Sequence, residues 1–144
     1  MEIYTIGFTH KSAEEFFGLL RGAGIRHLLD IRLHNSSQLA GFTKQADLAY
    51  FLREICAASY EHQPLLAPTA EILNAYRQDK DWEAYERNFR ALLGTRRAET
   101  LYSLESLATP TVLLCSEANA DHCHRRLVAE YWESSWGGLQ IIHL

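Results

Sequence analysis

The chain alternates short apolar runs with segments of helical periodicity, and this alternation predicts βα units around a parallel sheet. The apolar runs predict strands over residues 3–6, 26–31, 59–62, 112–115 and 139–143. Ser12, Thr43 and Asp121 each precede a segment with apolar residues three or four positions apart, so they are the predicted helix caps. A wholly helical stretch is predicted from Thr69 to about Leu107.

The order of these elements predicts the class of fold. It runs β-α-β-α-β, then helices, then β-α-β. We predict a three-layer, doubly wound α/β domain with a mainly parallel sheet of about five strands, Rossmann-like or flavodoxin-like, and a helical insertion in the middle. No internal repeat or linker interrupts the pattern, so we expect residues 1–144 to form one domain.

Three polar clusters follow predicted strands directly. They are the segments from Thr5 to His10, from Asp30 to Arg32 and from Cys115 to Glu117. The carboxyl ends of parallel strands lie at one edge of a doubly wound sheet, and ligands bind outside that edge. We therefore expect the three clusters to converge there and form a ligand site.

A further polar run, Cys123-His124-Arg125-Arg126, falls at the start of the last predicted helix. If Asp121 caps this helix, Cys123 and His124 lie in its first turn. The free backbone N–H groups and the helix dipole there favour negative charge, which suits a reactive thiolate or a bound phosphate or carboxylate.

The residues leave several interpretations of Cys115 and Cys123 open. Both could be small buried residues that only pack. They could bind a metal with His122 and His124, but adjacent helical residues point about 100° apart and the spacing matches no zinc pattern, so we predict no metal and no cofactor. They could also form a disulfide, which in a reducing compartment would be a redox feature.

The other clusters carry candidates of their own. Asp30 is either a catalytic residue or the partner of Arg32 in an ion pair, and Arg32 is placed to clamp an anion. Gly7 would permit a tight turn or the close approach of a ligand. Neither a G-x-G-x-x-G turn nor a phosphate-binding G-x-x-x-x-G-K-[ST] loop occurs. We interpret Trp82 and Tyr85 as core aromatics, and residues 37–42 as a candidate lid.

Composition narrows the classes of partner. The hydrophobic fraction is 47% and the charged fraction 22%, as in globular proteins. The net charge of −4 argues against a broad nucleic-acid-binding surface, although a local positive pocket remains compatible with it. Neither a signal peptide nor an apolar run of about 18 residues occurs, so we expect a cytoplasmic protein without a membrane partner. The oligomeric state is left open.

In several of these motifs, the sequence resembles the bacterial and archaeal family known only as domain of unknown function 488. The order and spacing agree from Thr5 to His143. The matching pieces are Thr5-Ile6-Gly7, Ser12 with its helix, Asp30-Ile31-Arg32, Gly41-Phe42, and a C-x-E…C-H-R motif formed by Cys115 to Glu117 and Cys123 to Arg125. The resemblance implies an α/β domain in which the cysteines are candidates for function, and it supplies no substrate.

The leading hypothesis is an enzyme that acts on a small anionic or nucleotide-like substrate. Glu117 would be the general acid or base, and a cysteine the nucleophile or redox group. The candidate catalytic residues are Cys115, Glu117, Cys123, His124 and Asp30, with His10 in reserve. The candidate ligand-binding residues are Thr5, Gly7, Arg32 and Arg125. The alternatives are a non-catalytic module for phosphate or nucleic acid, and a thiol redox or metal sensor.

Overall fold

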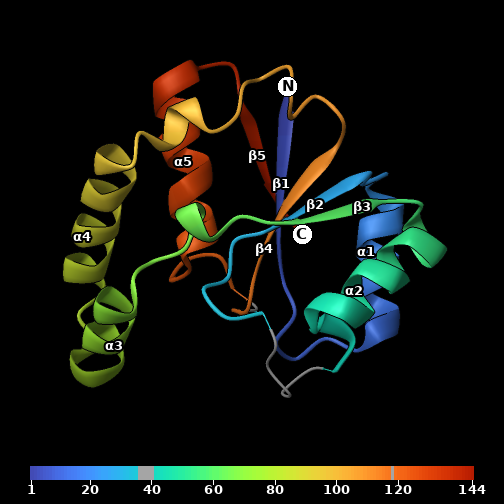
Figure 1. Cartoon of the computed structure of the whole chain (residues 1–144), viewed down its shortest axis with the longest axis horizontal. Coiled ribbons are helices and arrows are strands. Elements are labelled where there is room, and N and C mark those ends of the chain that lie inside the picture. The colour runs from blue at the N-terminus through green and yellow to red at the C-terminus, as the bar shows by residue number, and fades with distance from the viewer. Residues whose placement is uncertain (36–40, 118) are drawn as a thin grey trace.

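A computed structural model of the chain contains a five-stranded, all-parallel sheet in the order β3-β2-β4-β1-β5 (Figure 1). The structure describes residues 1–35, 41–117 and 119–144. Each predicted strand is confirmed to within two residues at either end. The strands are β1 (Glu2–Gly7), β2 (His27–Asp30), β3 (Ser59–His62), β4 (Thr111–Cys115) and β5 (Gln140–His143).

Helices cover both faces of the sheet, which confirms the predicted three-layer α/β fold (Figure 1). One face carries α1 (Ala13–Gly22) and α2 (Gln45–Phe51). The other carries α3 (Ala70–Asp79), α4 (Trp82–Thr95) and α5 (His124–Trp136). The shorter helical elements are η1 (Gly41–Thr43), the π-helical η2 (Leu52–Cys56), η3 (Pro64–Leu66) and η4 (Ala98–Thr100).

The core consists of two apolar clusters, one on each face of the sheet. Leu28 and Leu114 point toward α1 and α2, whereas their strand neighbours Leu29 and Leu113 point toward the α3–α5 side. Successive residues of a strand face opposite sides, so a strand buried on both faces needs the continuous apolar runs seen in this sequence.

The predicted cap of the first helix is confirmed. Ser12 is the N-cap of α1, and its hydroxyl oxygen accepts a hydrogen bond from the backbone N–H of Glu15 at 3.1 Å. The predicted cap at Thr43 is wrong, because Lys44 is the N-cap of α2. Thr43 instead lies buried in η1, where its carbonyl accepts a hydrogen bond from Arg32. A tertiary contact therefore outweighs the local capping preference.

The predicted cap at Asp121 is also wrong. Cys123 is the N-cap of α5, in an extended conformation with φ −138° and ψ 140°. Asp121 belongs to a preceding turn, in which its N–H bonds to the side chain of Asn119 and its carbonyl accepts from Arg126. These turn contacts delay the start of the helix by two residues.

The predicted helical middle of the chain is shorter than expected. It breaks at Lys80, which adopts the left-handed φ of 58° and ends α3, and α4 then stops at Thr95. Ser103 and Ser106 hydrogen-bond to each other's backbone in a turn, which competes with helix. The candidate lid lies mostly outside the described residues.

The strand order places the crevice of the sheet at β4. It differs from the 3-2-1-4-5 and 2-1-3-4-5 orders of the commonest doubly wound sheets, because β4 lies between β1 and β2. The chain leaves β1 and β2 toward the α1–α2 face, whereas it leaves β4 toward α5 on the opposite face. Neighbouring connections that diverge in this way open a crevice at the carboxyl end of the strand between them.

The register confirms that the three polar clusters converge. Gly7 pairs with Cys115 across β1 and β4, and Asp30 pairs with Leu114 across β2 and β4. Each cluster thus begins at the same edge of the sheet. Among the described residues, no helix is both long and apolar enough to cross a bilayer.

Candidate functional site

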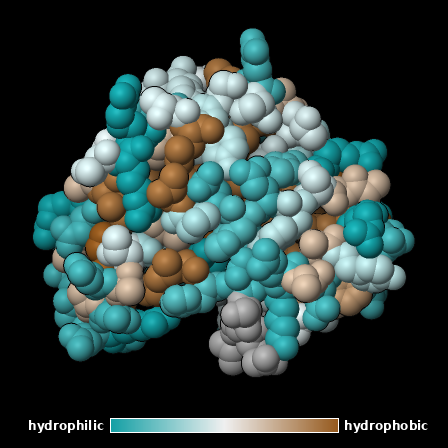
Figure 2. Space-filling model, in the orientation of Figure 1, coloured by the Kyte–Doolittle hydropathy of each residue, from teal (hydrophilic) through white to brown (hydrophobic). Residues whose placement is uncertain are grey.

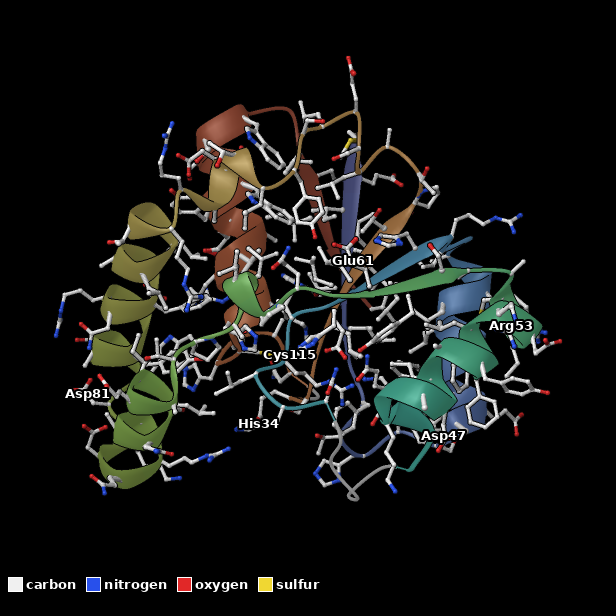
Figure 3. All side chains as sticks on the ribbon, in the orientation of Figure 1. His34, Asp47, Arg53, Glu61, Asp81 and Cys115 are labelled. Carbon is white, nitrogen blue, oxygen red and sulfur yellow. A yellow bond between two sulfur atoms is a disulfide. The ribbon has the colours of Figure 1, made fainter. Side chains whose placement is uncertain are left out.

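A cavity of about 690 Å³ lies between the carboxyl ends of β1, β2 and β4 and the helices α3 and α4. Cys115 and His34, both labelled in Figure 3, lie at this end of the sheet. Figure 2 shows the molecule in the same orientation, and on the half that carries α3, α4 and α5 hydrophobic residues are exposed among hydrophilic ones. The lining residues are Phe8, Thr9, Arg32–His34, Pro68, Leu73, Tyr76, Arg77, Lys80, Trp82, Tyr85, Cys115–Glu117 and His122–His124.

The charge of this lining is opposite in sign to that of the whole chain. Arg32, Arg77 and Lys80 line the cavity, and Glu117 is the one carboxylate among its described lining residues. The chain as a whole carries a formal net charge of −4. A concave region that concentrates positive charge on an acidic protein attracts anions to that region.

Asp30 and Arg32 form a buried ion pair, which is one of the two interpretations of Asp30 that the sequence allows. The Arg32 guanidinium donates to both carboxylate oxygens, at 2.9 and 2.8 Å, and Asp30 is fully buried. The backbone N–H of Arg32 and the hydroxyl of Tyr60 also donate to this carboxylate, at 3.2 and 2.6 Å. Burial and this bond to Asp30 raise the pKa of Tyr60, so its hydroxyl stays protonated and continues to donate. Asp30 lies behind the cavity wall rather than in it.

One nitrogen of the Arg32 guanidinium takes no part in these hydrogen bonds. Nη1 is buried and has no hydrogen-bond partner in the part of the chain that the structure describes. The side chain is only 4% exposed, lines the cavity and lies over the Phe8 ring at 5.4 Å. A buried, unsatisfied donor on a charged group costs about 1–3 kcal/mol or more, and an acceptor on a ligand would remove that cost.

Arg125 lies behind the cavity and joins β1 to the loop after β4. It is fully buried, and its Nε donates to the Thr5 hydroxyl at 3.2 Å while Nη1 donates to the Glu117 carbonyl. Thr5 is in turn hydrogen-bonded to Nδ1 of His143 at 2.5 Å. Burial lowers the pKa of Arg125 to about 10, so the group remains cationic at neutral pH. It contributes a fixed positive charge and holds Glu117 in place.

Gly7 allows the strand β1 and the loop after β4 to touch. A Cβ atom at this position would overlap the Glu117 carbonyl oxygen and lie 2.6 Å from Nη1 of Arg125. The group that approaches Gly7 closely is therefore the chain's own backbone, in place of the ligand that the sequence suggested.

Cys115 and Cys123 form a disulfide in the cavity wall, which was one of the interpretations left open. Each is 2% exposed. The remaining cysteine, Cys56, is free and buried on the other face of the sheet. The next residue, His124, is nearly buried, and its Nε2 donates to the Ile31 carbonyl at 2.6 Å.

Cys123 and His124 do not diverge as expected for adjacent residues of a helix, where side chains point about 100° apart. Cys123 is instead an extended N-cap, and the ligand atoms of Cys115, Cys123 and His124 all lie within 4.8 Å of one another. The three side chains can therefore face one point.

The predicted site residues divide into two layers. Five of them line the cavity: Arg32, Cys115, Glu117, Cys123 and His124. Four lie behind it and position the first group: Thr5, Gly7, Asp30 and Arg125. His10, at the exposed turn after β1, is not among the lining residues.

Sequence reasoning missed the wall contributed by α3 and α4. Arg77 and Lys80 were not singled out, and Trp82 was interpreted as a core residue. Trp82 does pack on buried Tyr85 at 5.0 Å, but it also lines the cavity, where His122 stacks on it at 4.8 Å. Helical periodicity identifies the apolar face of each helix, and it carries no information on which strand edge the helix pair covers.

The buried imidazole of His124 predicts an acid-sensitive fold. Burial lowers the pKa of His124 from 6.5 to about 4, and the charge of Arg125 acts in the same direction. The unfolded chain therefore binds this proton more readily than the folded chain, and stability is lost as pH falls below about 6.5. For the disulfide-bonded protein with chelator present, we expect a loss of about 2 kcal/mol between about pH 7.5 and pH 5.

Urea denaturation at the two pH values measures this loss. His124→Gln keeps an amide that can donate to Ile31 and has no titratable ring, so the pH-dependent part should shrink. His122→Gln is the matched control, because it removes an exposed imidazole in place of the buried one. An unchanged pH dependence in His124→Gln would contradict the assignment.

The comparisons with known proteins identify a family. A family model described as "Domain of unknown function DUF488" matches residues 12–132, which include α1 and the strand ends of β2 and β4. No curated protein and no solved structure gives a significant match to this chain. Because the family model spans most of the sequence, the chain belongs to the DUF488 family.

Proposed function

We propose that the chain binds a small anionic, nucleotide-like ligand in the cavity at the carboxyl ends of β1, β2 and β4. The observation that carries this proposal is Arg32, a buried cation in the cavity wall whose Nη1 lacks an acceptor among the described residues. A phosphate or carboxylate oxygen would supply one. The cavity volume of about 690 Å³ lies within the usual range of about 300–1,000 Å³ for small-molecule sites.

Two exposed cations support the anionic part of the ligand. Arg77 and Lys80, near the end of α3, line the same cavity as Arg32. Their side chains are long and solvated, so they can follow a charged group into the site at little cost. Since Arg32 is already paired with Asp30, these two residues supply the net positive charge.

The aromatic wall supports the flat part of the ligand. Tyr76 and Trp82 line the cavity, and their ring centroids lie 5.7 Å apart. A heteroaromatic ring that stacks on such a surface gains about 1–3 kcal/mol with little selectivity between bases. The combination of cations and aromatic rings suits a nucleotide better than a simple inorganic anion.

The same cavity holds groups for chemistry. Glu117 is exposed in its lining and is the candidate general acid or base. Cys115 and Cys123 are joined in a disulfide, so a nucleophilic thiolate requires the reduced protein. An enzymatic role that uses one of these cysteines therefore predicts activity only under reducing conditions, whereas ligand binding by the arginines and aromatic rings does not depend on the thiols.

Calorimetric titration with AMP, adenosine and inorganic phosphate tests the binding proposal. We expect saturable binding of AMP and binding at least about tenfold weaker for adenosine or phosphate alone, because each keeps only part of the contacts. The double variant Arg77→Gln/Lys80→Gln should weaken AMP binding by about tenfold, which corresponds to about 1.4 kcal/mol.

Arg87→Gln is the matched control for these substitutions. Arg87 is exposed on α4 and is not among the lining residues, so it changes the net charge without touching the cavity. If Arg87→Gln weakened AMP binding as much as the double variant Arg77→Gln/Lys80→Gln, or if AMP did not bind at all, the proposed site would be wrong.

A further inference from the structure

We propose that Cys115, Cys123 and His124 form a binding site for a thiophilic divalent cation such as Zn²⁺ when their disulfide is reduced. The site would lie in the cavity wall, and oxidation would abolish it. This inference does not depend on the proposed anionic ligand, because none of the cations that support that ligand takes part.

The positions of the three side chains carry the proposal. Their ligand atoms lie within 4.8 Å of one another, on residues contributed by the end of β4 and the start of α5. Around a tetrahedral zinc ion with bonds of about 2.0–2.3 Å, ligand atoms are about 3.5–3.8 Å apart. Movements of about 1 Å in the side chains would therefore complete the arrangement once the sulfurs separate.

The backbone leaves room for that separation. The α-carbons of Cys115 and Cys123 are 7.4 Å apart. Two thiolates can therefore lie side by side and point to a common ion without movement of β4 or α5. Both cysteines are 2% exposed, and burial of two thiolate charges requires a cation to neutralise them.

The hydrogen bond of His124 leaves one ring nitrogen, Nδ1, available as a ligand. Its Nε2 donates to the Ile31 carbonyl at 2.6 Å, so the hydrogen resides on Nε2 and the lone pair on Nδ1. Histidine ligands commonly donate their second ring N–H to a backbone carbonyl, which fixes the tautomer and the orientation of the ring. Ile31 would perform this function here.

The ligand set selects the type of metal and leaves one position open. Two thiolates and one imidazole favour zinc over magnesium or calcium, which prefer oxygen ligands. Sites with three protein ligands keep a fourth position for water or substrate, and all three residues line the cavity. The open position would therefore face the cavity.

A dithiol reductant opens the Cys115–Cys123 disulfide. The reductant transfers two electrons and two protons to the disulfide and leaves as its own cyclic disulfide, so Cys115 and Cys123 become thiols. Each thiol then loses one proton to solvent when Zn²⁺ binds. In the reverse direction, a disulfide oxidant accepts two electrons from the two thiolates and two protons from solvent and leaves as a dithiol, so that the Cys115–Cys123 bond reforms and the ion is released.

Metal titration of the intact chain tests the site. Protein reduced with a dithiol and freed of reductant under anaerobic conditions should bind one Zn²⁺ per chain in competition with a chromophoric chelator. With Co²⁺ as probe, it should show thiolate-to-metal charge transfer and the visible bands of tetrahedral cobalt. The disulfide form should bind neither ion. These comparisons use the wild-type chain, so they do not depend on whether a variant folds.

Variants assign the ligands. Cys115→Ser and Cys123→Ser should weaken Zn²⁺ binding by more than about 100-fold, since even partners of the ligands contribute about 10–100-fold. His124→Gln should weaken binding but retain the thiolate charge-transfer band. Cys56→Ser is the matched control, because Cys56 is also buried and lies on the opposite face of the sheet, and it should bind like the wild type.

Two results would overturn the proposal. One is a reduced wild-type chain that takes up no stoichiometric Zn²⁺. The other is a reduced chain whose Zn²⁺ affinity is the same with and without Cys123. Neither result affects the AMP titration, so failure of the metal site and failure of the anion site are distinguishable.

Discussion

Replacement of Asp30 by Asn should lower the free energy of unfolding by about 3–5 kcal/mol. The substitution removes the counter-charge of Arg32, which is only 4% exposed and so gains little compensation from solvent. It also weakens the acceptor for Tyr60, which donates to the same carboxylate. Loss of one partner of a buried ion pair is costly because the other charge stays buried without compensation. Urea denaturation at neutral pH measures the change.

The exposed pair Arg53–Glu54 is the matched control for this prediction. Its side chains are 67% and 54% exposed, so water already screens the interaction. Glu54→Gln should change the free energy of unfolding by less than about 1 kcal/mol. The double variant Asp30→Leu/Arg32→Met removes both charges together and should cost less than Asp30→Asn alone. If Asp30→Asn and Glu54→Gln changed the free energy of unfolding equally, the buried Asp30–Arg32 pair would stabilise the fold no more than an exposed pair does.

Gly7→Ala should destabilise the protein by about 3 kcal/mol or more, although it adds one methyl group. The new Cβ would overlap the Glu117 carbonyl oxygen and lie 2.5 Å from its carbonyl carbon, and backbone atoms cannot move aside as a side-chain tip can. Either β1 or the loop after β4 must shift, and Arg125 would lose its contact with Glu117. Because Glu117 lines the cavity, the affinity for AMP should decrease together with the free energy of unfolding.

Gly18→Ala provides the control with the opposite sign. Gly18 is exposed in α1, and nothing lies within 4 Å of the position that its Cβ would occupy. Alanine favours helix over glycine by about 0.5–1 kcal/mol, so this variant should be slightly more stable than the wild type. Thermal unfolding of both variants gives the comparison. A Gly7→Ala protein as stable as Gly18→Ala would contradict the close packing of β1 against the Glu117 loop.

The fold was predictable because its determinants are local. A strand that is buried on both faces needs a continuous apolar run. The run from Thr111 to Cys115 is of this kind, and it forms β4. The capping of α1 by Ser12 is likewise local, since donor and acceptor are three residues apart. Alternation of strands and helices then leaves the three-layer arrangement as the natural outcome.

The predicted cap at Thr43 failed because a more distant residue decides its position, whereas the predicted cap at Asp121 failed because a second local motif competes with it. Thr43 is drawn into a turn whose carbonyl serves Arg32, eleven residues earlier in the chain. The backbone of Asp121 is held in a turn by hydrogen bonds to the side chains of Asn119 and Arg126, and this turn replaces the first turn of the predicted helix. In both cases a side-chain contact that helical periodicity does not report decides where the helix begins, so periodicity alone misplaces the start by one or two residues.

The sequence by itself determined which polar groups end the central strands. It placed Arg32, Cys115 and Glu117 at one edge of a parallel sheet, because parallel strands share a direction and their carboxyl ends must meet. Only the tertiary structure decided what these groups do for one another. Strand order put β4 between β1 and β2, an ion pair with Asp30 satisfied most of Arg32, and packing of α3 and α4 added Lys80 and Trp82 to the wall. Such contacts join residues far apart in the chain, so no local pattern encodes them.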